Sequence, residues 1–188
     1  MNTDRAAITF ATAATDDDFE QILKLQQQNL LHTLSTETQS EQGFVFAEHT
    51  AVILKSMAAQ LPQVIALHNG QVIGYNLAMS ADMQDKLPSL APMFIEFDKC
   101  TYKGRKLIDY KFIVGGQVCV DKNFRGYGLM SKLYRETASR VPNDYQLCVT
   151  EISTRNTKSL AAHQKMGFEV VTTYNDEREL WNIVVWEF

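Results

Sequence analysis

Long hydrophobic runs are missing from this 188-residue chain, which has 45% apolar and 21% charged residues, as soluble globular proteins do. No window approaches the ~20 consecutive apolar residues of a membrane span, so we expect no membrane partner. Residues 1–5 lack the basic region and apolar core of a secretory signal. These absences predict a cytoplasmic protein.

An excess of positive charge is also missing. The chain has 18 Lys and Arg against 22 Asp and Glu, a net charge of −4. Nonspecific nucleic-acid binding depends on Lys and Arg contacts to phosphates, so we expect no nucleic-acid partner. The length fits a single domain over residues 1–188, which must then hold the whole site.

Cysteine and histidine are too scarce and scattered for a disulfide framework or a metal site. The three cysteines are an odd number, and Cys119 and Cys148 lie in apolar strand patterns where free thiols behave as small hydrophobes. A catalytic thiol would need a nearby histidine and an electropositive setting. We therefore expect reduced packing cysteines and no metal. The residues concerned are Cys100, Cys119 and Cys148, with His32, His49, His68 and His163.

The most informative stretch is 118–130, where an apolar strand pattern breaks into a glycine-bearing turn and continues as an amphipathic helix. Gly126 and Gly128 permit torsions and close approaches that a Cβ forbids. The helix expected over 129–140 points unpaired N–H groups into the turn, which favours an anion. Arg125 adds a permanent positive charge beside these amides. The stretch therefore predicts a diphosphate-binding turn.

A second group of polar residues follows about 30 positions later. A helix is predicted from capping residues at about Asn156 to Met166, and it stops at Gly167. An advance of about 100° per residue places Asn156, Ser159 and His163 on one stripe that can line a ligand. The alternative is that Asn156 only caps the helix and that His163 is a satisfied histidine without a ligand.

The remaining pattern predicts alternating sheet and helix in the C-terminal half. Asn69-Gly70 between two β-rich runs is a strong hairpin signal. The polar segment 33–42 has no periodicity and predicts a loop. The aromatic-rich region 80–112 is the least regular, and it predicts either a long connection whose aromatic side chains cover the core or a helix with a lid. The predicted elements are strands at 8–10, 64–67, 72–77, 146–151, 168–174 and 180–187, a strand starting at 113, and helices at 19–31, 50–60, 129–140 and 156–166.

These motifs together resemble the Gcn5-related N-acetyltransferase (GNAT) superfamily, best over residues 113–174. Its acetyl-CoA motif, Arg/Gln-x-x-Gly-x-Gly/Ala after a strand, matches at Arg125 and Gly128. The later family block of an asparagine and a helix ending in Gly-Phe matches at Asn156 and at 163–168.

Two positions depart from the family pattern. Met130 stands where the family usually has glycine or alanine. His163 stands where many members have a tyrosine thought to protonate the departing CoA thiolate.

The resemblance implies an α+β fold of α/β/α type. Its central sheet would be mixed and mostly antiparallel, with about six or seven strands, helices on both faces and a splay between the two central strands. It also implies an N-acetyltransferase that moves an acetyl group directly from acetyl-CoA to a small-molecule or peptide amine, and it leaves a homodimer open. The pantetheine would follow the strand and the diphosphate would bind the turn. The candidate cofactor-binding residues are Val118, Cys119, Val120, Arg125, Gly126, Tyr127, Gly128, Leu129, Met130, Ser131, Asn156, Ser159 and His163.

Catalysis needs a base, because an amine such as lysine, with a pKa near 10.4, must lose a proton before attack. Glu151, at the end of a predicted strand, is the first candidate, and a plain surface carboxylate is the alternative. Gln117 could orient a water. His163 is a candidate acid for the thiolate if it is protonated, and otherwise a hydrogen-bond partner of the CoA sulfur or pantetheine.

Other functions fit less well. A nucleotide hydrolase would carry Lys-Ser or Lys-Thr after Gly128, and a dinucleotide oxidoreductase would have glycine at Ser131. A serious alternative is an acyl-CoA-binding sensor or interaction module of the same fold without turnover. Segments 33–49 and 80–112 are expected to form the acceptor pocket, and the acceptor itself is not identified.

Overall fold

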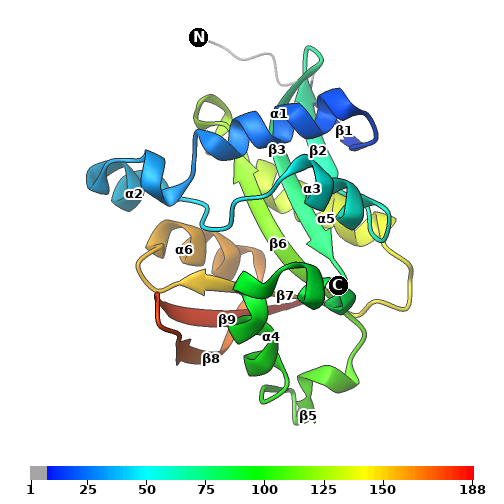
Figure 1. Cartoon of the computed structure of the whole chain (residues 1–188), viewed down its shortest axis with the longest axis vertical. Coiled ribbons are helices and arrows are strands. Elements are labelled where there is room, and N and C mark those ends of the chain that lie inside the picture. Colours follow the sequence, from blue (N-terminus) through cyan, green and yellow to red (C-terminus); the bar gives the residue numbers. More distant parts are fainter. Residues whose placement is uncertain (1–7) are drawn as a thin grey trace. The chain divides into compact units, whose positions relative to one another are not determined.

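The computed structural model describes residues 8–188 and has a mixed α+β fold. Its main sheet has seven strands among the described residues, in the order β1-β2-β3-β6-β7-β9-β8 (Figure 1). The strands are β1 (Ile8–Thr12), β2 (Val64–His68), β3 (Gln71–Met79), β6 (Phe112–Val120), β7 (Leu147–Ser153), β8 (Glu169–Asn175) and β9 (Leu180–Glu187); β4 (Thr101–Tyr102) and β5 (Arg105–Lys106) form a separate hairpin.

Six α-helices and several short 3-10 turns complete the described chain. The α-helices are α1 (Asp16–Gln27), α2 (Thr36–Gln42), α3 (Ala51–Ala58), α4 (Ala91–Phe97), α5 (Leu129–Arg140) and α6 (Thr157–Met166). The 3-10 turns are η2 (Leu31–Thr33), η3 (Ala81–Lys86), η4 (Pro88–Leu90), η5 (Leu107–Asp109) and η6 (Lys122–Phe124).

The chain divides into two compact units, each made of three separate segments. Among the described residues, the first unit contains 8–33 with Val45–Ala78 and Gly116–Val141. The second contains Leu34–Phe44, Met79–Gly115 and Pro142–Phe188. The organisation of residues 1–188 as a single domain stays a prediction.

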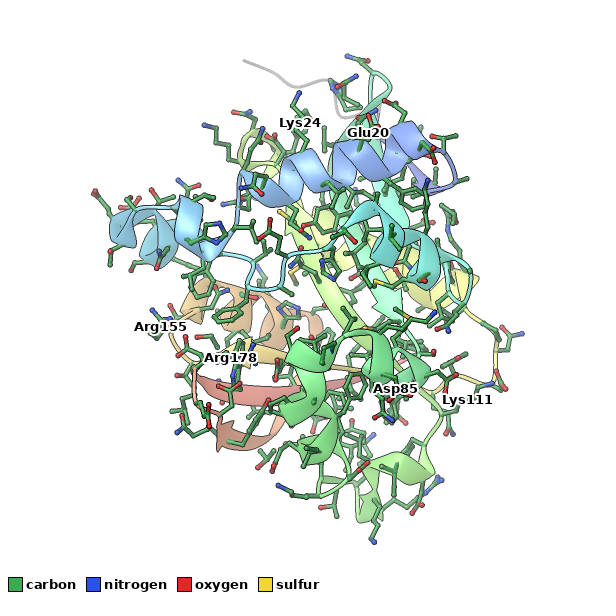
Figure 2. The ribbon with its side chains drawn as sticks, in the orientation of Figure 1. Glu20, Lys24, Asp85, Lys111, Arg155 and Arg178 are labelled. Atoms are coloured by element: carbon green, nitrogen blue, oxygen red, sulfur yellow. The ribbon has the colours of Figure 1, made fainter. Side chains whose placement is uncertain are left out.

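The first unit has helices on both faces of its strands, as predicted. Behind the strands in Figure 1, α5 packs Leu129 and Leu133 against Val64 and Ala66 of β2, and all four side chains are buried. In front lie α1 and α3, and Met57 Cε on α3 would lie 3.2 Å from a Cβ on Gly116 of β6. Figure 2 shows the exposed Glu20 and Lys24 on the outer side of α1. Alternating strand residues therefore face different helices.

Local sequence signals explain several element ends. The predicted hairpin turn at Asn69-Gly70 is present with φ values of 52° and 76°, as a tight type I′ turn requires. At the start of α1, Thr15 and Asp18 form a reciprocal capping box. That helix ends at Gln27, four residues before the predicted end.

The prediction of a loop over 33–42 is wrong, because this segment contains α2. Ser35 caps the helix by accepting a hydrogen bond from the Thr38 amide at 3.2 Å. Gly43 ends it at φ 73°. The helix is short and has no buried residues, so no apolar periodicity marks it in the sequence.

The second unit is built on β7, which pairs antiparallel with β9, while β9 pairs antiparallel with β8. The parallel register of β6 with β7 covers Phe112↔Leu147 to Val114↔Val149 and ends there, although both strands continue. This short parallel pairing agrees with the predicted splay. Gly115 follows the last pair, and a Cβ there would lie 3.2 Å from Cys148 Sγ.

The region 80–112 contains the helix α4, the β4–β5 hairpin and the 3-10 turns η3, η4 and η5. Phe97 is buried and makes edge contacts with Phe94 and Phe112, at centroid distances of 5.9 Å in each case. Aromatic side chains here thus cover the core of the second unit.

All three cysteines are buried and free, as predicted. Burial raises the pKa of Cys100 to about 11 and that of Cys119 to about 12, and it also raises the pKa of Cys148. Among residues 8–188, no helix has the length and apolar character needed to cross a membrane. Over the same residues, no cluster of three or more His, Cys, Asp or Glu side chains could hold a metal ion.

Candidate functional site

The turn between β6 and α5 has the backbone that its glycines predict. Gly126 and Gly128 have φ values of 81° and 72°, a region that residues with a Cβ rarely adopt. A Cβ placed on either glycine would meet no atom within 4 Å. Both glycines are exposed, so the turn is open on the side where a ligand would approach.

The start of α5 offers backbone donors to that open side. The amides of Leu129, Met130 and Ser131 have no acceptor within the described part of the chain, since the first helical bond comes from Lys132 to the Gly128 carbonyl at 3.2 Å. Unpaired amides at a helix N-terminus carry partial positive charge and bind anions. These residues therefore fit a diphosphate group.

Several side chains of residues 118–129 pack in the hydrophobic core of the first unit. Leu129 is buried, while Val118, Val120 and Tyr127 pack against the same hydrophobic cluster. Cys119 is 6% exposed, and its carbonyl would lie 3.1 Å from a Cβ on Gly74. Any cofactor contact of these residues would thus come from the backbone.

Arg125 points its guanidinium back toward the protein. Its Nε donates to the Val120 carbonyl at 2.9 Å, and one terminal nitrogen donates to Asn29 Oδ1 at 2.6 Å. The charge stays next to the turn, but these contacts also fix the turn against β6 and the residues after α1. Asn29 was not singled out from the sequence, because it lies 96 positions from Arg125.

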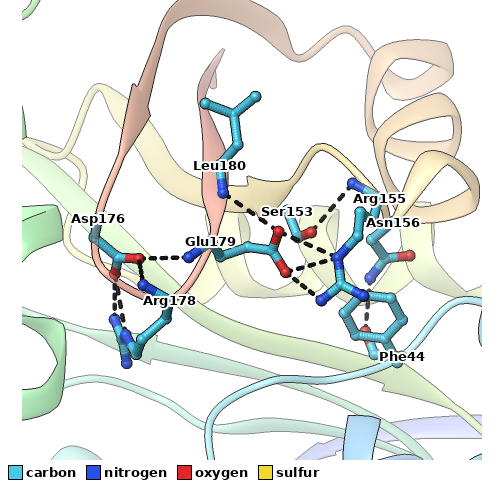
Figure 3. A network of polar contacts seen from close by, with 8 residues as sticks. All are labelled: Phe44, Ser153, Arg155, Asn156, Asp176, Arg178, Glu179 and Leu180. Carbon is cyan, nitrogen blue, oxygen red and sulfur yellow. Dashed lines mark hydrogen bonds and ion pairs between the residues drawn. The ribbon is translucent and has the colours of Figure 1, made fainter.

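In the second unit, Asn156 is fully engaged by the protein (Figure 3). Its Oδ1 accepts from the Ser159 amide at 3.4 Å and caps α6, and its Nδ2 donates to the Phe44 carbonyl at 2.8 Å. A Cβ on Gly43 would lie only 2.8 Å from that Oδ1. Asn156 thus caps α6, as one prediction had it, and also holds the end of segment 34–44.

His163 lies on the predicted stripe with Asn156 and Ser159, and it is 2% exposed. Its Nδ1 donates to the Ser159 carbonyl at 2.7 Å, and its ring packs edge-on against Phe168 at 4.9 Å. Burial lowers the pKa of His163 to about 4, so the ring is neutral at physiological pH. This geometry favours the hydrogen-bonding role over that of an imidazolium acid.

Glu151 is a partly buried carboxyl group on β7. Burial raises its pKa to about 7, while a hydrogen bond from the Tyr174 hydroxyl at 2.5 Å and the charge of Arg178 oppose this increase. The charge of Asp176 adds to it. A carboxyl group that titrates near neutral pH suits a general base.

Tyr174 had no signal of its own in the sequence. The Tyr174 hydroxyl reaches Glu151 because β9 lies between β8, which carries Tyr174, and β7, which carries Glu151. Trp181 of β9 pairs both with Tyr174 and with Ser153 of β7. Only this register places the phenol diagonally across from the carboxyl group.

An ion-pair network closes the β8–β9 connection (Figure 3). Arg155 binds the carboxylate of Glu179 through Nε and a terminal nitrogen, and Glu179 also accepts from the Leu180 amide at 3.3 Å. Asp176 accepts from Arg178 and from the Glu179 amide. The network fixes the residues beside Glu151 and the start of α6.

Gln117 uses its Oε1 and one of its two Nε2 hydrogens within the first unit. Its Nε2 donates to the Ala47 carbonyl at 2.8 Å, and its Oε1 accepts from the Tyr75 hydroxyl at 2.6 Å and from Gln26 at 2.8 Å. It joins β6 to the segment before α3. The candidate residues therefore form two groups, with 118–131 in the first unit and Glu151 and 156–163 in the second.

The chain is similar to known proteins in both sequence and structure. A family model described as the acetyltransferase (GNAT) family matches residues 19–168. No curated protein matches. The solved structures that resemble the chain include NAA60 from Arabidopsis thaliana in complex with acetyl-CoA, with 13% identity, a TM-score of 0.64 and coverage of 96% of this chain and 99% of that one.

Two further solved structures share the fold. One is yncA from Salmonella typhimurium with its cofactor acetyl-CoA, at 15% identity, a TM-score of 0.61 and coverage of 96% and 93%. The other is the ribosomal-protein-S18-alanine N-acetyltransferase from Escherichia coli, at 12% identity, a TM-score of 0.58 and the same coverage. At these identities the likeness shows the fold and not the acceptor.

Proposed function

Because this chain belongs to the acetyltransferase (GNAT) family, we propose that it transfers an acetyl group from acetyl-CoA to the amine of a small molecule or peptide in the cytoplasm. The observation that carries the proposal is the open start of α5. Three amides without an acceptor among residues 8–188 follow two glycines with positive φ, and Arg125 lies beside them. This arrangement suits the diphosphate of CoA.

The proposed reaction is a direct transfer. The amine nitrogen forms a bond to the thioester carbonyl carbon, the carbon–sulfur bond breaks, and the CoA thiolate leaves. The amine loses one proton, which the Glu151 carboxylate accepts directly or through a water. With a pKa of about 7, Glu151 is deprotonated in a large fraction of molecules at neutral pH and can still hold the proton afterwards.

The thiolate must gain a proton or a hydrogen bond. A neutral His163 that already uses Nδ1 for the Ser159 carbonyl is a poor source of a full proton at neutral pH. We therefore assign His163 the role of a hydrogen-bond partner that orients the CoA sulfur or pantetheine. The hydrogen of the CoA thiol then comes from solvent or from the proton that the amine releases. Its neutral, buried ring is also the observation that favours the second candidate, an acyl-CoA-binding module without turnover.

The two candidates separate in one experiment. The protein is incubated with acetyl-CoA and a panel of amines while free thiol is measured, and CoA binding is measured by calorimetry. Thiol release that depends on an amine supports the transferase. Binding without release from any amine supports the module, and the absence of CoA binding would contradict both. Glu151→Gln is the matched variant, which should bind CoA normally and lose roughly 10²- to 10⁴-fold in turnover.

A further inference from the structure

A buried polar network in the first unit connects α1, β3, β6 and the segment before α3. Gln26 is 1% exposed, His49 5% and Tyr75 0%. Gln26 Nε2 lies 2.8 Å from His49 Nδ1 and donates to Gln117 Oε1 at 2.8 Å. Gln117 in turn binds Tyr75 and the Ala47 carbonyl. The proposed transfer mechanism uses none of these side chains.

Two backbone groups determine the direction of every hydrogen bond in this network. The His49 amide can only donate, so Gln26 Oε1 accepts from it at 2.8 Å and both hydrogens of Gln26 lie on Nε2. The Ala47 carbonyl can only accept, so Gln117 presents Nε2 to it and Oε1 to Gln26 and Tyr75. Gln26 therefore donates to both Gln117 and His49.

This assignment fixes the tautomer of His49. Since Nδ1 accepts from Gln26, the single proton of the neutral ring lies on Nε2. Burial keeps the ring neutral, because it lowers the pKa of His49 to about 4. If the proton were on Nδ1, it would point at a hydrogen of Gln26 Nε2, and no hydrogen bond could form between the two nitrogens.

The proton-bearing Nε2 of His49 has no partner among residues 8–188, and it is not among the enclosed unpartnered atoms of that part of the chain. It therefore reaches the surface through the small exposed part of the ring. The His49 side chain is 95% buried and Gln26 holds its ring, so it presents an N–H donor in a fixed direction at the surface, where an acceptor atom from outside the chain can bind it.

We propose that His49 Nε2–H binds an oxygen atom of the acceptor beside its reacting amine, and that Gln26 is the positioning residue that holds the ring for this contact. The inference rests on the proposed acetyl transfer. Gln117 connects His49 to the proposed cofactor strand, because it belongs to the same network and directly precedes Val118, the first of the candidate pantetheine residues. The acceptor class is an amine with a neighbouring carbonyl or hydroxyl oxygen, in preference to a plain polyamine.

The test uses the full chain and three acceptors: a dipeptide amide, an amino sugar and a polyamine without oxygen. His49→Asn keeps a polar atom near the Nδ1 position for Gln26 but removes the Nε2–H donor. We expect the KM for whichever oxygen-bearing acceptor is used to rise roughly two- to tenfold, as loss of one neutral hydrogen bond predicts. The KM for acetyl-CoA and the KM for the polyamine should not change. His32→Asn, at an exposed histidine, is the control.

A second measurement is independent of turnover. Nitrogen NMR of ¹⁵N-histidine-labelled protein should show the Nε2–H tautomer for His49 at neutral pH, and Gln26→Glu should move the proton to Nδ1, because a carboxylate accepts where the amide donated. In the presence of CoA, the dipeptide amide or the amino sugar should shift the Nε2 signal, and the polyamine should not.

Three results would overturn the inference: an Nδ1–H tautomer in the wild type, no Nε2 shift with either oxygen-bearing amine, or an equal effect of His49→Asn on all acceptors. If no amine is acetylated at all, the proposed function fails. The Nε2 shift then still decides whether His49 binds oxygen-bearing amines.

Discussion

Glu151 is the proposed general base, and its environment leads to a prediction about the pH dependence of turnover. Its pKa is raised to about 7 by burial, and only the deprotonated form can accept a proton from the amine. We expect kcat/KM to rise with pH below about 7 and to level off above it. Glu151→Gln should remove most of the activity at every pH. A pH profile of the wild type that is flat between pH 5.5 and 8 would contradict the assignment.

Tyr174 provides a control for that profile. Its hydrogen bond to Glu151 lowers the carboxyl pKa against the effect of burial. Tyr174→Phe removes this bond, so the pKa of Glu151 should increase further and the acidic limb of kcat/KM should move to higher pH. A limb that stays in place would show that another group controls the profile.

His163 makes stability depend on pH. Its pKa is about 4 in the folded protein and near 6.5 in the unfolded chain, so unfolding takes up a proton between these values. Stability is therefore lost as the pH falls through that window. Relative to His163→Asn, the wild type should lose about 1.4 kcal/mol of unfolding free energy per pH unit.

Urea unfolding at several pH values measures this difference. Because His49 and Glu151 are present in both proteins, their own pH dependence cancels in the comparison. Parallel stability curves for the wild type and the variant would mean that His163 titrates normally in the folded protein.

At the scale of elements, the turn before α5 combines backbone strain with a proposed function, and these two effects can be separated. Gly128→Ala and Gly70→Ala both place a Cβ at positive φ, 72° and 76°, with no atom within 4 Å. Each should cost about 1–2 kcal/mol of stability. Only Gly128→Ala should weaken CoA binding, by roughly tenfold or about 1.4 kcal/mol, because its methyl group enters the open turn.

Calorimetric titration with CoA and urea unfolding of both variants provide the comparison. If the two alanine variants bound CoA with equal affinity, the turn before α5 would not be part of the cofactor site. The result for Gly70→Ala is expected to match the wild type in binding, since this glycine is in the β2–β3 hairpin.

The α2 segment is attached to α6 through Gly43 and Asn156. Gly43→Ala adds positive-φ strain and a Cβ at 2.8 Å from Asn156 Oδ1, so it should destabilise the protein by about 2 kcal/mol. Gly104→Ala, at φ 78° with open space, carries the strain without the clash and should cost less. The double variant Gly43→Ala with Asn156→Ala should lose less unfolding free energy than the sum of the two single variants, because Asn156→Ala removes the oxygen with which the new Cβ clashes. Strict additivity would contradict this explanation.

At the scale of the whole molecule, binding of acetyl-CoA should stabilise the fold by mass action. At a ligand concentration about 100 times Kd, the expected gain is about 2.7 kcal/mol. For a chain of this length that corresponds to an increase in Tm of roughly 5–10 °C. Thermal unfolding over a series of CoA concentrations tests this, and Gly128→Ala should need a higher concentration for the same shift. No shift at millimolar CoA would contradict a CoA site.

Most elements could be predicted from the sequence because their signals are local. Thr15 caps α1, Asn69-Gly70 makes the hairpin turn and Gly167 ends α6, each through contacts within a few residues. The helix α5 was predicted with its observed bounds, Leu129–Arg140. The helix α2 was missed because it buries no residue, so the sequence marked it through its end residues Ser35 and Gly43 and not through apolar periodicity.

The sequence by itself determined the family, the glycine-bearing turn before α5 and the stripe of Asn156, Ser159 and His163, because glycine torsions, helix starts and helical spacing are properties of neighbouring residues. Tertiary structure alone decided the protonation of His163, the pKa of Glu151 and the tautomer of His49. These depend on burial and on partners such as Tyr174 and Gln26, which lie 23 positions away from Glu151 and His49 respectively. Solvent exclusion and cross-strand register exist only in the folded chain, and they determine which of these groups carry a proton.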